Sequence, residues 1–70
     1  MFWWFERRGQ HVRVEVLQLS ADLYELRTVH ADETEHVETF TNATDLGKRQ
    51  RELQNGLSTD GWTGPHGWVV

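Results

Sequence analysis

The sequence holds 70 residues, carries a formal net charge of −4 and contains no cysteine. This length allows one domain at most, and the lack of cysteine excludes disulfides and thiolate metal sites. The acidic balance argues against nucleic acid and anionic membranes as partners. The apolar run at residues 1–5 is too short for a signal peptide or a membrane span, so we expect a cytoplasmic protein.

Residues 2–41 carry the patterns of β-strands. The stretch HVRVEVLQL alternates apolar and polar residues, which indicates a strand with one buried face. The apolar positions change parity at Leu17 and Leu19, so we expect either a bulge near Leu17 or a strand end that is covered on both faces. An aromatic strand precedes this one, and DLYELRTVH and TEHVETF predict two more. Short turns separate the four strands, which favours an antiparallel meander over residues 1–41.

From residue 42 the pattern becomes helical, and we expect a helix over residues 42–60. Thr41 or Asn42 is predicted to cap its N-terminus. Gly61 is predicted to end it in the left-handed conformation, with Trp62 folding back onto the last turn. Residues 61–70 are predicted to form an irregular tail that docks on the sheet. The apolar face of the helix is marked by Ala43, Leu46, Gln50, Leu53 and Leu57.

The expected fold is therefore α+β, a four-stranded antiparallel meander with one C-terminal helix packed on one face, in a single domain over residues 1–70. The first strand has aromatic side chains on both faces, because Trp3 and Phe5 project one way while Phe2 and Trp4 project the other. We expect one of these pairs to lie under the helix. The other pair needs a different cover.

His30 and His36 flank a run rich in acids and first suggest a metal site. A two-residue turn at residues 32–33 would point the two histidines to opposite faces, whereas a three-residue turn could set them opposite each other. We favour the two-residue turn, which also places Arg27 opposite Glu38 as a cross-strand ion pair. We therefore expect no metal site, and nothing in the sequence predicts a cofactor.

Nucleophilic catalysis requires a nucleophile, a base and an orienting group within reach of one another. The only serines, Ser20 and Ser58, fall in a predicted turn and near the predicted helix end. Asp60 and His66 could approach each other around the loop DGWTGPHG, but such a pair is more often a hydrogen bond. We predict no catalytic residue and expect that the protein is not an enzyme.

Tryptophan and arginine are the residues that most often anchor protein interfaces. We therefore expect a protein-interaction module, whose partner is another protein or a second copy of the chain bound through an aromatic sheet face. One alternative is single-stranded nucleic acid, whose bases would stack on the tryptophans, although eleven acids oppose seven bases. Another is a small ligand in a tryptophan-lined groove. The candidate surface consists of Trp3, Trp4, Arg7, Arg8, Arg13, Trp62 and Trp68.

Two stretches, WWFERRG near the start and DGWTGPHG near the end, resemble a group of short uncharacterised bacterial proteins of about this length. The resemblance spans the whole chain but is anchored only at these two stretches. It implies a domain of unknown function in the bacterial cytoplasm. It implies no catalytic residue, cofactor or partner.

Overall fold

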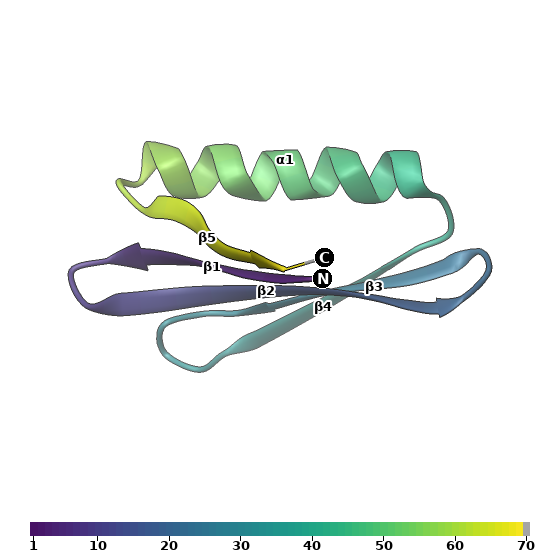
Figure 1. The fold of residues 1–70 in the computed structure, drawn as a ribbon, viewed down its shortest axis with the longest axis horizontal. Helices are drawn as coiled ribbons and strands as arrows, with labels where there is room; N and C mark the ends of the chain where they lie inside the picture. The colour runs from purple at the N-terminus through teal and green to yellow at the C-terminus, as the bar shows by residue number, and fades with distance from the viewer. Residues whose placement is uncertain (70) are drawn as a thin grey trace.

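The computed structural model describes residues 1–69, with the backbone alone at residues 68 and 69. Five strands and one helix follow one another along the chain, and the helix crosses one face of the sheet (Figure 1). The elements are β1 (Phe2–Arg7), β2 (Gln10–Ser20), β3 (Leu23–Val29), β4 (Glu35–Phe40), α1 (Ala43–Thr59) and β5 (Thr63–Val69). The α+β class is thus confirmed. No helix within residues 1–69 has both the length and the apolar character needed to cross a membrane.

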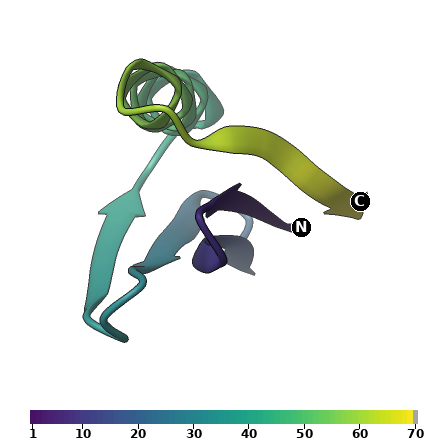
Figure 2. The same ribbon diagram turned by 90° about the vertical axis from the view of Figure 1, so that its left-hand side faces the viewer.

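The sheet is antiparallel with the strand order β4-β3-β2-β1-β5. The first four strands form the predicted meander, but the prediction of four strands is wrong because the tail adds a fifth. β5 returns along β1, so that β1 is paired on both sides. In Figure 2 the helix lies end-on above the sheet, with β4 and β5 at the two edges. The N-terminal strand is therefore an inner strand of the sheet rather than a fraying end.

The fifth strand escaped prediction because its pairing is irregular. Three residues of β5 lie against two of β1 in each of two successive steps, since Phe2 pairs with Val69, Trp4 with His66 and Glu6 with Thr63. Each step therefore holds one extra residue, as in a β-bulge. The extra residues destroy the alternation that marks a strand in a sequence, and Gly64 and Gly67 adopt positive φ angles of 140° and 63°.

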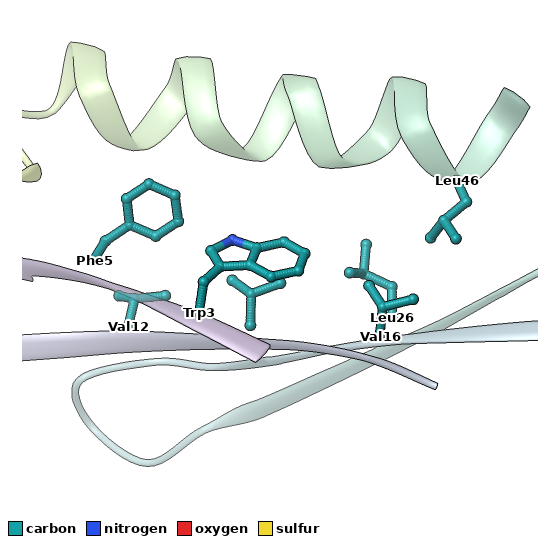
Figure 3. Packing of buried hydrophobic residues seen from close by; sticks show 7 residues of the cluster. Trp3, Phe5, Val12, Val16, Leu26 and Leu46 are labelled. Carbon is teal, nitrogen blue, oxygen red and sulfur yellow. The ribbon is translucent and has the colours of Figure 1, made fainter. Parts of the chain in front are cut away.

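The core lies between the sheet and the helix. Trp3 and Phe5 are the pair under the helix, with 4% and 1% of their surface exposed. Figure 3 shows both rings standing on β1 toward α1, while Leu46 points down from the helix. Half-buried side chains complete the cluster around them, namely Tyr24, Phe40, Leu53, Leu57 and Trp62, and the other buried members are Val12, Val14, Val16 and Leu26.

Both predicted helix ends are confirmed. The side chain of Asn42 accepts a hydrogen bond from the Asp45 backbone N–H at 2.8 Å, which caps the N-terminus. At the C-terminus Gly61 has a φ of 86°. Its N–H donates to the Ser58 carbonyl at 3.1 Å, and that of Trp62 donates to the Leu57 carbonyl at 2.9 Å. These two bonds define a Schellman motif, which directs the chain back toward the sheet.

The predicted turn between β3 and β4 is wrong by one residue. The loop holds residues 31–33, because the His30 N–H donates to the Thr34 carbonyl at 2.9 Å and Glu33 takes a φ of 69°. A left-handed third residue is typical of three-residue hairpin loops, but here no glycine marks it. Asp32 steadies the loop by accepting from the Thr34 N–H at 3.0 Å. Hydrogen bonds from Thr34, the side chain first and then the backbone, lower the pKa of Asp32.

This register changes the predicted cross-strand contacts. His36 pairs with Thr28 and Arg27 pairs with Val37, so His30 and His36 lie on the same face rather than on opposite ones. The predicted Arg27–Glu38 ion pair is absent from the described part of the chain. Arg27 instead contacts Glu25 on its own strand at 2.8 Å, and Glu38 contacts Arg49 of α1 at 3.0 Å.

The change of parity in β2 also has an explanation. The register of β2 against β3 shifts between Gln18 and Ser20, where Gln18 pairs with Tyr24 but Ser20 pairs with Leu23. The irregularity lies at Leu19, two residues beyond the expected position. Leu17 and Leu19 are 44% and 51% exposed, so the strand end is not covered on both faces.

Replacement of Thr28 by valine should stabilise the protein. Thr28 is 2% exposed, and its hydroxyl has no hydrogen-bond partner among residues 1–69. An apolar group of the same shape removes that desolvation cost, so we expect Thr28→Val to raise the free energy of unfolding by about 1–3 kcal/mol. Urea unfolding followed by circular dichroism measures the change. The exposed Thr39 provides the control, and an equal gain in Thr39→Val would show that burial is not the cause.

Candidate interaction surface

The sheet face opposite the helix carries the second aromatic pair. Phe2 and Trp4 project from β1 on this face, and the residues directly opposite them on β2 are Glu15 and Arg13. On the other side of β1, Trp4 lies beside His66. A shallow hollow of about 380 Å³ opens here, and its lining defines what we call the Trp4 surface: Phe2, Trp4, Glu6, His11, Arg13 and His66.

Trp4 is held in place by β5. Its ring centroid lies 6.1 Å from that of Phe2 and 6.1 Å from that of His66. Its six-membered ring lies against the backbone of Gly67, where an added Cβ would come within 1.7 Å of a ring carbon. Only glycine can therefore occupy position 67 in this arrangement, because any Cβ would overlap the ring, and the positive φ of 63° also favours glycine. The bulged fifth strand therefore covers part of Trp4, one member of the second aromatic pair.

Polar contacts fix the rim of the hollow. The Thr63 hydroxyl donates to the Glu6 carbonyl at 3.0 Å and lies 3.2 Å from Nε2 of His66. His11 lies 3.1 Å from the Glu6 carboxylate, and both side chains are about half exposed. Arg13 is exposed and makes no ion pair within the described residues. The surface thus offers aromatic rings beside an available guanidinium.

The structure distributes the predicted surface residues over separate places. Trp4 and Arg13 lie side by side on the open face, but Trp3 is buried in the core. Arg7 and Trp62 meet at the helix end, where the guanidinium carbon lies 4.6 Å from the ring centroid. There Nη1 of Arg7 donates to the Asp60 carbonyl at 2.8 Å. Arg8 lies exposed in the turn after β1 with a φ of 50°, and the side chain of Trp68 is outside the described part of the chain.

Four members of the Trp4 surface were missing from the predicted surface: Phe2, Glu6, His11 and His66. The alternation of β1 places Phe2 and Glu6 on the face of Trp4, so their position was available from the sequence. His11 follows from the short turn that pairs β1 with β2. His66 could not be found, because its position depends on the bulged pairing of β5.

The other candidate chemistries receive no support from the geometry. His30 and His36 share a face, but no group of three or more histidine or carboxylate side chains within residues 1–69 is arranged to hold a metal ion. His66 contacts Thr63, and no hydrogen bond joins it to Asp60 in that part of the chain. Comparisons with protein-family models, with curated proteins and with solved structures give no match for this chain.

The packing of Trp4 on Gly67 can be tested by comparing two glycines. In Gly67→Ala the new methyl group collides with the ring, so we expect a loss of at least about 1 kcal/mol in the free energy of unfolding. Gly56 is helical with open space around it, so Gly56→Ala should gain about 0.5–1 kcal/mol. Chemical unfolding measures both, and tryptophan fluorescence should change in Gly67→Ala only. Equal stability of the two variants would contradict the described contact.

Proposed function

We propose that the chain is a small non-enzymatic protein-binding module, and that the Trp4 surface contacts an exposed segment of another protein. The observation that carries this proposal is the fixed, partly exposed ring of Trp4 beside Arg13, which makes no ion pair within residues 1–69. A ring that β5 already holds in place loses little conformational freedom on binding, and such pre-organisation favours affinity. Tryptophan and arginine together are the side chains most enriched at the centres of interfaces.

The surroundings of the ring suggest the chemistry of the partner. Phe2 and Trp4 would contact an apolar or aromatic side chain, and Arg13 would pair with a carboxylate close to it in the bound segment. The same face carries the carboxylates of Glu6 and Glu15, which would repel the row of charges on a phosphate backbone more strongly than a single peptide carboxylate placed at Arg13. This charge pattern favours a peptide over single-stranded nucleic acid.

Selection from a phage-displayed library of random peptides tests the proposal. We expect the wild-type protein to enrich peptides that join an apolar residue to an acidic one. Trp4→Ala should weaken binding of a selected peptide by about 30-fold or more, the effect of losing a central tryptophan anchor. Fluorescence anisotropy of the labelled peptide measures the affinity. Circular dichroism shows whether each variant is folded.

Two controls make the result specific. Arg13 is exposed, so Arg13→Glu should preserve the fold while reversing the charge and weakening the peptide. Leu19→Ala lies outside the Trp4 surface and should bind like the wild type. Selected peptides that bind Trp4→Ala and Arg13→Glu unchanged would overturn the proposal. Quenching of tryptophan fluorescence by a thymidine oligonucleotide at low salt, with no peptide enriched, would favour the nucleic-acid alternative.

A further inference from the structure

The two edges of the sheet differ in whether they can accept another strand. β5 forms one edge, and its bulges, together with Pro65, which lacks an N–H, interrupt any regular ladder on its outer side. β4 forms the other edge and pairs with β3 without a register shift from Tyr24↔Phe40 to Val29↔Glu35. Its outer side is a regular row of backbone donors and acceptors.

The register identifies the residues of β4 that point outward. The hydrogen bond from His30 to Thr34 marks a hydrogen-bonded pair, and such pairs alternate with non-bonded ones along an antiparallel ladder. The even-numbered residues of β4 therefore bond to β3. The outward groups belong to Glu35, Val37 and Thr39, all three of which are exposed. Val37 is 48% exposed.

We propose that two copies of the chain associate through this edge, β4 against β4, around a two-fold axis at Val37. Val37 then pairs with Val37 of the second copy, and Glu35 pairs with Thr39 of the second copy. Both are pairs of outward residues, so each exchanges two hydrogen bonds without disturbing the β3–β4 ladder. The two valine side chains cover each other's exposed surface on the face opposite the helix.

Charge selects this register over its neighbours. An axis at Val37 sets His36 opposite Glu38 of the second copy, where the imidazole would join a carboxylate that already contacts Arg49 at 3.0 Å and His36 of its own chain at 3.8 Å. An axis at Glu38 would set two carboxylates directly opposite each other, and an axis at His36 would oppose two imidazoles. If one β4 strand slid past the other by an odd number of residues, outward residues of one copy would face inward residues of the other. The hydrogen bonds between the two copies could then not form.

Sedimentation velocity over a concentration series tests the association. We expect the wild-type protein to shift from monomer to dimer as its concentration rises through the range up to about 1 mM, as befits a small interface. Val37→Pro removes an outward N–H that bonds to nothing in the ladder, so the variant should fold but remain monomeric. Val37→Thr keeps the N–H and a β-branched side chain and should dimerise within about threefold of wild type.

His36→Glu guards against the case in which the proline variant does not fold. His36 is exposed. The substitution places a carboxylate opposite Glu38 of the other copy on each side of the axis, so we expect the dimer to form about tenfold more weakly or worse. A wild-type protein that stays monomeric up to about 1 mM would overturn the proposal. So would undiminished dimerisation of folded His36→Glu.

A single introduced cysteine reports the register, because the chain has no other. Val37→Cys places the two thiols across the axis and should form a covalent dimer under mild oxidation much faster than Ser58→Cys, an exposed control on the helix. Trp4→Ala should dimerise like the wild type, since the association does not depend on the Trp4 surface. Loss of the dimer in Trp4→Ala, with equal cross-linking of the two cysteine variants, would assign self-association to the aromatic face instead.

Discussion

The structure depends on one constraint, which is that β1 carries aromatic side chains on both faces. A strand of this kind needs cover above and below. The helix covers Trp3 and Phe5 on one side, and the backbone of Gly67 covers part of Trp4 on the other. β5 therefore has two roles. It pairs with the free side of β1, and its backbone at Gly67 supplies the flat surface on which the Trp4 ring packs. The Schellman motif at Gly61 and Trp62 starts this return of the chain.

The same constraint links the stability of the fold to its candidate site. Among the side chains that the structure describes, seven apolar ones form the buried core, and only Leu46 of them comes from the helix. The helix therefore contributes little fully buried area, and the sheet must be stabilised from within by Phe5, Val14 and Leu26. Because Trp4 neighbours Phe5 on the same strand, the ring that stands at the candidate surface is fixed by the most buried part of the molecule.

Sequence patterns predicted the parts of this molecule that depend on local chemistry. The alternation of Val12, Val14 and Val16 shows which face of β2 is buried. Asn42 and Gly61 mark the helix ends because the Asn42 side chain caps the first turn and Gly61 adopts a left-handed conformation after the last one. β5 was not predictable in this way, since the need for glycine depends on tertiary contacts, with the Trp4 ring at Gly67 and with Phe5 and the Trp4 carbonyl at Gly64. The prediction of the β3–β4 register was wrong for a related reason. Glu33 takes a left-handed conformation that is usually found at glycine, so the sequence carried no sign of it. Half of the Trp4 surface follows from β1 alone, and His66 follows only from the tertiary pairing.

The open face and the β4 edge together determine what a pair of chains could bind. The proposed association around Val37 would keep both Trp4 surfaces on the same face of one continuous sheet, with seven strand-to-strand steps between them along the order β1-β2-β3-β4 and its symmetric copy. At about 4.8 Å a step the two sites are at most about 34 Å apart across the strands, and less where the sheet curls. An extended segment of about ten residues covers that distance, whereas a flexible linker needs about 40 residues for its average span to match. A partner could carry two segments, each with an apolar and an acidic residue, joined by about ten extended or about 40 flexible residues. Such a partner would occupy both Trp4 surfaces of the dimer at once, so that two weak contacts could give a tight complex.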